Sequence, residues 1–251
     1  MKQLNLNICG SDRTKATIED VLAVETPQKT DTWTPIGHGF LIDQTRKHLD
    51  ENGFDVVDEN HNLARFGQRY FGLMQVQDRN APENADRATV VGLRNGHDKC
   101  FPAGIMAGDA PFVCSNLIFN NEIVIARRHA KNIDNVNVAG NIFMKIANAI
   151  GKLRESWVSQ EKRVGAYKDY DLGSNKEAND LIIRAYQSGA CSKTQIADIV
   201  EQWNKPNHNE FADRNLYSLY NSFSEVWKGN LGLLPARSTS LHSLFDATAE
   251  A

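Results

Sequence analysis

The spacing of apolar side chains along this chain of 251 residues predicts its first helix. In residues 40–54, FLIDQTRKHLDENGF, apolar positions recur every three or four residues, which is helical spacing. Gly53 stands where a residue in the left-handed region commonly ends a helix. The preceding residues 1–33 are mostly polar, and we expect them to form a loosely packed lead-in segment with room for one strand.

After Gly53 the pattern changes to short runs rich in Val, Ile, Phe and Tyr, separated by Gly, Asn, Asp and Pro. Such runs are typical of consecutive antiparallel strands joined by turns. Residues 77–87 are polar and predict a loop between two of the strands. The predicted strands are residues 54–60, 69–77, 88–94, 103–108, 111–119 and 122–128.

Residues 138–168 return to helical spacing and predict one long helix with a single buried stripe. Three cations of this helix, Lys145, Lys152 and Arg163, fall on one line about 100° around the axis from that stripe. The helix therefore combines a core face with a basic ridge. The apolar stripe consists of Ile142, Ile146, Ile150, Leu153, Trp157 and Val164.

Helical patterns also dominate the rest of the chain, from residue 169 onward. An aromatic series at helical spacing, which we interpret as helix-packing core, consists of Tyr217, Tyr220, Phe223 and Trp227. The tail, residues 238–251, is expected to be short and mobile.

Segregation of the strands from the helices predicts an α+β fold rather than a wound parallel sheet. The expected order is a helix, an antiparallel β-meander, a long helix and a helical C-terminal region. We divide the chain into a lead-in segment (1–33), an α+β core domain (34–168) and the helical C-terminal region (169–251).

Composition narrows the class of protein. Hydrophobic residues make up 41% of the chain and charged residues 24%, which is ordinary for a globular protein with a real core. The first residues lack the apolar core of a signal peptide, and no window approaches the ~18 apolar residues of a membrane span. The four cysteines form no CxxC pair. We expect reduced thiols in a cytosolic compartment and no contact with a membrane.

Positive charge is concentrated in one part of the chain. The net charge is −3, yet residues 122–168 carry nine basic and four acidic side chains between acidic flanks. Binding of single-stranded nucleic acid requires cations near phosphates and aromatic faces for bases, so this segment favours that function over a solvated basic face. The predicted phosphate contacts are Arg127, Arg128, Lys131, Lys145, Lys152 and Arg163, and Arg69 accompanies the predicted stacking residues Tyr70 and Phe71 in an earlier strand.

A second candidate lies in residues 90–116, VVGLRNGHDKCFPAGIMAGDAPFVCSN. His97 and Cys100 are three residues apart, so an imidazole could activate a thiol there, although no residue is obviously placed to orient the imidazole. The simpler interpretation is a hairpin tip, in which Asn95 and Gly96 supply the turn chemistry, His97, Asp98 and Lys99 sit at the turn, and the cysteines act as small hydrophobes. We favour the hairpin.

Metal and nucleotide sites have no sequence motif in this chain. Neither H-E-x-x-H, C-x-x-C, GxxxxGK[ST] nor a GxGxxG that opens a helix occurs. We therefore predict no metal and no cofactor, and an enzyme is the less favoured class. Donors that could converge on a metal only through the fold are His38, His48, His61, His97, Asp98, Asp109, Cys114 and His129.

Three stretches carry a family resemblance: residues 34–76, residues 90–119 and residues 230–246. Together they resemble a family of uncharacterised phage- and plasmid-encoded proteins whose domain of unknown function centres on the motif NSHDKSFPAG…VFVCxN. Gly96 stands here where that motif usually has Ser. The resemblance implies a protein of a bacteriophage or mobile element in the cytoplasm of a bacterial host. It implies no reaction, and no residue role is carried over.

The predicted order of elements is also similar to the core of phage single-strand annealing proteins, which bind DNA between sheet and helix as oligomers. Our first hypothesis is a non-enzymatic DNA-metabolism protein that binds single-stranded DNA, promotes annealing and forms a homo-oligomer. The second is a protein-interaction factor that acts on a host protein, and the third is a metal- or thiol-dependent enzyme.

Overall fold

The structure is a computed structural model of the chain and describes residues 13–80, 87–100, 102–111, 118–126, 137–228 and 233–250. Its centre is an antiparallel sheet in which each strand pairs with the next along the chain, in the order β1-β2-β3-β4-β5-β6. The strands are β1 (Arg13–Ala16), β2 (Phe54–Ala64), β3 (Arg69–Asp78), β4 (Arg87–Gly96), β5 (Ala103–Pro111) and β6 (Ile118–Ala126).

This meander, together with the helices around it, confirms the α+β class. The strand expected in the lead-in segment is β1, and the segment also forms a short helix, α1 (Ile18–Leu22). Thr17 begins α1 with a capping box in which its side chain accepts from Asp20 N while Asp20 accepts from Thr17 N. The two strands predicted over 111–128 differ from the structure, where β6 runs through the boundary between them and residues 112–117 lie outside the described part.

Helix α2 (His38–Glu51) corresponds to the first predicted helix. It ends as the sequence indicated, because Gly53 has a φ of +80° and turns the chain into β2. Phe54 then folds back into the core, where its ring meets Trp157 edge-on at 5.2 Å between centroids.

The prediction of a single long helix over residues 138–168 is wrong in one respect, because the structure has two successive helices there. Helix α3 (Asn137–Gly151) ends where Lys152 has a ψ of −4°, and α4 (Leu153–Asp169) begins directly after it. Lys152 N donates to Ala149 O, three residues back, so the chain tightens for one turn. The break follows Gly151, and glycine destabilises a helix interior more than any other residue except proline.

Four helices, α5 (Asn175–Gln187), α6 (Ile196–Asn204), α7 (Leu216–Trp227) and α8 (Leu234–Ala249), form the C-terminal region, with short 3-10 turns at Lys193–Gln195 and Asn209–Phe211. The expectation of a mobile tail is wrong. Residues 238–249 belong to α8, whose Leu241 and Phe245 are fully buried, so packing fixes the end of the chain. The aromatic series of α7 is core, as predicted.

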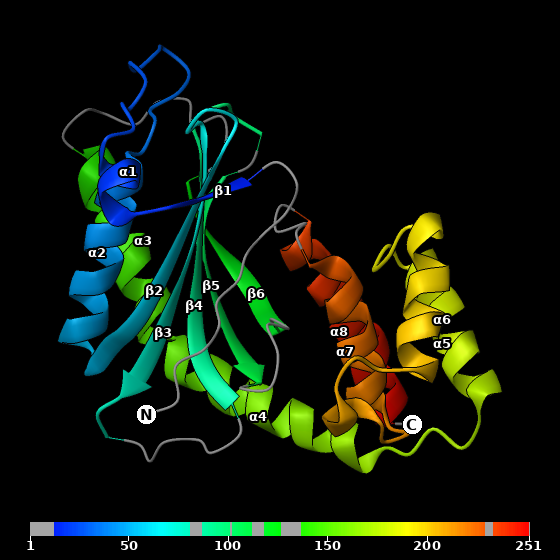
Figure 1. The fold of residues 1–251 in the computed structure, drawn as a ribbon. Helices are drawn as coiled ribbons and strands as arrows, with labels where there is room; N and C mark the ends of the chain where they lie inside the picture. The colour runs from blue at the N-terminus through cyan, green and yellow to red at the C-terminus, as the bar shows by residue number, and fades with distance from the viewer. Residues whose placement is uncertain are drawn as a thin grey trace.

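The sheet separates two hydrophobic cores (Figure 1). On one side α2 and α3 cover the face that carries Met74 and Val91. On the other side Leu73 and Val90 join the core of the C-terminal helices, and α4 passes from one side to the other. None of the described helices is long and apolar enough to cross a lipid bilayer.

Candidate functional site

The nine residues predicted to bind nucleic acid are not brought together as one surface. Arg127, Arg128 and Lys131 lie outside the described residues. Lys145 on α3 and Lys152 at the junction with α4 are exposed, and neither forms an ion pair in the part of the chain that the structure describes. Among the described members of the set, these two lysines are the ones that remain available to a phosphate.

Arg163 and Arg69 are instead part of the framework. Arg163 Nε donates to Asp246 Oδ1 on α8 at 2.9 Å, which ties α4 to the last helix. Arg69 Nε donates to Asp98 Oδ2 at 2.5 Å, which ties β3 to the turn after β4. A guanidinium already neutralised by a carboxylate attracts a phosphate less, so the geometry does not support the prediction that Arg163 contacts a phosphate or that Arg69 binds nucleic acid.

The two predicted stacking residues have no free face. Tyr70 is 0% exposed and Phe71 is 3% exposed, because successive residues of β3 point to opposite faces of the sheet and both faces are covered. Tyr70 lies on the α2 side, where its hydroxyl is 3.0 Å from His61 Nδ1. The prediction that a base stacks on Tyr70 or Phe71 is therefore wrong, because neither ring is accessible.

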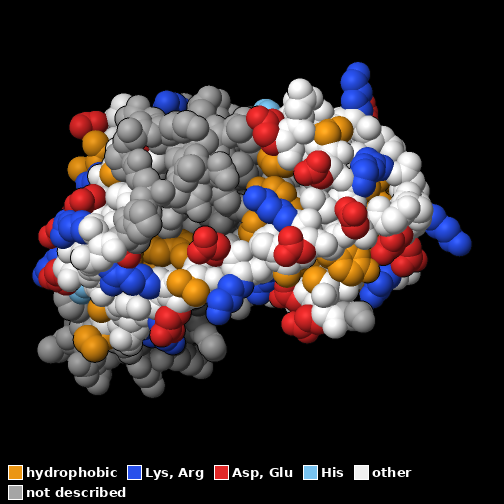
Figure 2. Space-filling model, turned by 90° about the horizontal axis from the view of Figure 1, so that it is seen from below, with side chains coloured by type: hydrophobic (Ala, Val, Ile, Leu, Met, Phe, Trp, Pro, Cys, Tyr) orange, Lys and Arg blue, Asp and Glu red, His pale blue; other side chains and the backbone are white. Residues whose placement is uncertain are grey.

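The basic ridge is also interrupted by acidic side chains. Seen from below the sheet, Lys and Arg side chains alternate with Asp and Glu over the described surface, with no continuous basic band (Figure 2). Arg154 of α4, for example, donates to Asp78 Oδ2 at 2.6 Å and lies over the ring of Phe54. Charge in residues 122–168 is thus partly used to hold α4 to the sheet.

The motif around His97 forms a closed polar network at the turn end of the sheet. Asn95 Nδ2 donates to Ile36 O at 2.7 Å and lies 3.0 Å from His38 Nδ1. His97 Nε2 donates to the same Ile36 carbonyl at 2.9 Å. His38 Nε2 donates to Gly67 O at 2.9 Å. These bonds fasten the start of α2 and the β2–β3 turn to the end of β4.

Burial keeps these two imidazoles neutral. His38 is 1% exposed, and burial, with a smaller effect from the neighbouring His97, lowers its pKa to about 4. Burial likewise lowers the pKa of His97. Since His38 donates from Nε2 and receives the Asn95 amide at Nδ1, both of its ring nitrogens are satisfied in the neutral tautomer. His38 therefore has no ring nitrogen free to act as a base.

The rest of the motif is bound in the same way. The predicted hairpin is confirmed, since β4 and β5 pair antiparallel and the chain turns from His97 to Lys99, where Lys99 has a φ of +61°. Only the expectation that Asn95 and Gly96 supply the turn is wrong, because both residues belong to β4. Lys99 Nζ lies 4.6 Å from the centre of the Trp33 ring. Cys100 is exposed beside the Arg69 guanidinium, so it does not behave as a buried hydrophobe. Cys114 lies outside the described residues.

The network does not form a thiol or metal site. His97 and Cys100 have different partners, Ile36 O and Arg69 Nη2, rather than each other. Among the described residues, no group of three or more His, Cys, Asp or Glu side chains is arranged to hold a metal ion. The chemistry of this motif is therefore that of a structural clamp.

A pocket of about 440 Å³ opens beside the clamp, between α1 and the β2–β3 turn. His97 and Gln68 lie on one side of it, and the residues after α1 lie on the other. At its rim stands Phe66, which is 107% exposed. Sequence reasoning missed Phe66; the available signal was a large apolar side chain in a turn between two strands. The remaining lining residues are Asp20, Ala23, Val24, Glu25, Pro27 and Gly67.

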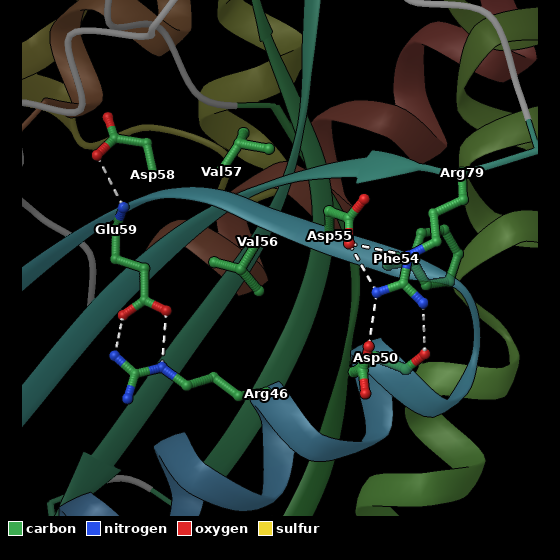
Figure 3. Close-up of a pocket in the computed structure, with 9 residues that line it drawn as sticks. All are labelled: Arg46, Asp50, Phe54, Asp55, Val56, Val57, Asp58, Glu59 and Arg79. Atoms are coloured by element: carbon green, nitrogen blue, oxygen red, sulfur yellow. Dashed lines mark hydrogen bonds and ion pairs between the residues drawn. The ribbon is translucent and has the colours of Figure 1, made fainter.

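A second pocket, of about 480 Å³, lies between α2 and the first half of β2 (Figure 3). Arg46 pairs with Glu59 on one side of it, and Arg79 pairs with Asp50 and Asp55 at 2.5 and 2.6 Å on the other. Burial raises the pKa of Glu59, but hydrogen bonds from His61 and Arg46 outweigh this and lower it to about 2. A carboxylate held charged and paired in this way is not a proton donor for catalysis.

The outer edge of β2 borders this second pocket. Among the described strands β1 pairs only with residues 61–64, so residues 54–60 have no partner strand on that side. A bulge between Val56 and Asp58 distorts this edge, and Asp58 Oδ1 accepts from Glu59 N at 2.9 Å. Bulges and charged side chains are the usual protection of an edge against strand addition.

Comparisons with known proteins add no family or fold neighbour: no family model matches the chain, and the searches of curated proteins and of solved structures gave no significant match.

Proposed function

We propose that this is a phage or mobile-element protein that binds single-stranded DNA in the host cytoplasm, without chemistry on it, and that binding serves annealing. The observation that carries the proposal is the pair Lys145 and Lys152. Lys145 on α3 and Lys152 at the junction with α4 are exposed and have no carboxylate partner among the described residues, whereas Arg154 and Arg163 of α4 are paired. An unpaired lysine that neutralises a phosphate releases a counterion, which favours binding.

The proposal is tested by fluorescence anisotropy of a labelled single-stranded oligonucleotide at several salt concentrations. We expect the double variant Lys145→Glu/Lys152→Glu to weaken binding at low salt. If the two lysines each neutralise one phosphate, the slope of log K against log salt should become shallower by about 1.4, since each contact on a single strand contributes about 0.7.

A matched control is Lys176→Glu/Lys193→Glu, which changes the same total charge on exposed lysines of the C-terminal region. Equal losses in the two double variants would mean that only net charge matters and would remove the assigned surface. Absence of wild-type binding at low salt would remove the function itself.

The runner-up function is an interaction with a host protein. The aromatic series on α7 offers no surface for such a partner, because it is buried: Tyr217 is 7% exposed and Tyr220 is 0% exposed. A pull-down from host lysate that enriches one protein after nuclease treatment would favour this function over DNA binding.

A further inference from the structure

Phe66 is the most exposed large hydrophobic side chain among the described residues, at 107%. It stands at the tip of the hairpin formed by β2 and β3. Arg65 beside it is also exposed, and the next residues are Gly67 and Gln68. An aromatic ring with both faces open, next to a cation, is the pair of groups from which single-strand binding surfaces are built.

The backbone of this tip is unusual for the residues it contains. Gln68 N donates to Arg65 O at 3.1 Å, and the two residues between them, Phe66 and Gly67, have φ values of +56° and +83°. Positive φ at both central positions defines a type I′ turn, in which Asn or Gly is the usual first residue. Phe66 therefore stands where Asn or Gly would suit the backbone better. The requirements of the turn do not account for a phenylalanine at this position.

The tip is also held rigidly. The Gly67 carbonyl accepts from His38 Nε2, and a Cβ built on Gly67 would lie 3.0 Å from Val24 Cγ2. The clamp of His38, Asn95 and His97 therefore fixes the hairpin tip against α1 and α2. A binding group that is already immobile loses little conformational entropy when its ligand arrives.

We propose that Phe66 is the platform on which a base of the single strand stacks, with Arg65 contacting the adjacent phosphate. This rests on the proposed function and adds a residue to it. The carboxylates of Asp20 and Glu25 line the neighbouring pocket and repel phosphate, so the strand's backbone lies on the Arg65 side of the ring. The pocket beside the ring leaves space for the stacked base.

The experiment uses an oligonucleotide that contains 2-aminopurine, a fluorescent base that is quenched when it stacks on an aromatic ring. With wild-type protein we expect quenching on binding. With Phe66→Ala we expect quenching to be lost and affinity to fall by about tenfold, which is within the range for loss of one base–aromatic contact. Phe66→Tyr should retain both, because the ring is kept. Duplex DNA should show no dependence on residue 66, since its bases are already stacked on one another.

The control is Tyr186→Ala, which removes an aromatic side chain that is 41% exposed on α5. This variant should bind and quench as the wild type does. If the wild type binds but Phe66→Ala binds and quenches equally well, the platform is overturned while the proposed function stands. If the wild type does not bind at all, the proposed function has failed. If Phe66→Ala changes only the molecular mass measured by light scattering, Phe66 contacts a second copy of the chain and the platform is again overturned.

Discussion

The imidazole rings of His38 and His97 stack with their centroids 3.9 Å apart and their planes 5° from parallel. The two residues are 59 positions apart in the sequence, and both bond the segment that leads into α2 or the turn that follows β2. Two stacked imidazoles that share one buried site cannot both carry charge without repulsion. The stack is therefore a contact that exists in the neutral state of the pair.

Folding stability should fall as the pH is lowered. Because the folded pKa of His38 lies near 4 while an unfolded histidine titrates near 6.5, the unfolded state binds more protons between these values. The stability is full above pH 6.5 and is lost as the pH falls through about 4, with a total of about 3 kcal/mol from His38. Urea unfolding at pH 7 and at pH 4.5 measures the change in the free energy of unfolding. His38→Gln should flatten the dependence.

Removal of His97 should destabilise the fold rather than abolish a reaction. His97→Ala removes one of the two donors to Ile36 O and the stacking partner of His38, so we expect a loss of about 1–3 kcal/mol. Lys99→Ala, which removes the contact of the ammonium group with the half-buried Trp33 ring, should cost less than about 1 kcal/mol. Denaturant midpoints compare the two, and an unchanged midpoint for His97→Ala would argue against the clamp.

Phe66→Asn should separate stability from binding. Asn tolerates the left-handed region, which costs most residues about 1–2 kcal/mol, so the variant should be as stable as the wild type or more stable by up to about 1 kcal/mol. It should bind single-stranded DNA more weakly, because the ring is gone. Thermal unfolding and anisotropy on the same preparation measure both effects. A loss of stability would show that Phe66 packs in the fold.

Asp246 of α8 accepts hydrogen bonds from two residues of α4. Its Oδ1 accepts from Arg163 Nε at 2.9 Å and from the Tyr167 hydroxyl at 2.6 Å. Asp246→Ala leaves both donors without this acceptor, and we expect a loss of about 1–3 kcal/mol with an unchanged salt slope for DNA binding. Lys228→Ala, which removes an ion pair within one helical turn, should change stability by less than about 1 kcal/mol. A steeper salt slope for Asp246→Ala would show that Arg163 contacts a phosphate once its carboxylate partner is removed.

Local patterns predicted the elements of this fold better than their ends. Helix α2 and Gly53 follow from spacing and backbone preference alone, and the meander follows from short β-rich runs. The hairpin between β4 and β5 was also predicted, but the role of Asn95 was not. Asn95 donates to Ile36 O, 59 residues away, and no local pattern contains such a contact. Helix α8 was missed because its polar residues hide Leu241 and Phe245, whose burial depends on the neighbouring helices.

The candidate site was less predictable than the fold, for a physical reason. The sequence does not show whether a basic side chain will pair with a carboxylate in the folded protein. Arg69 and Arg163 pair with carboxylates that are 29 and 83 residues away. An aromatic residue in a strand does not reveal whether its face is covered. Tyr70 was buried and Phe66 was not, although they lie four residues apart.

Strands β3, β4 and β5 place consecutive residues into different cores: Leu73 and Met74, Val90 and Val91, Ile105 and Met106. The same strands therefore line both cores. Loss of packing in one core exposes strands whose opposite face packs in the other. We expect one cooperative melting transition rather than two. A chain cut after α4 would uncover the apolar face of the sheet that carries Leu73 and Val90, so the C-terminal helices are a required part of the folding unit rather than an attachment to it.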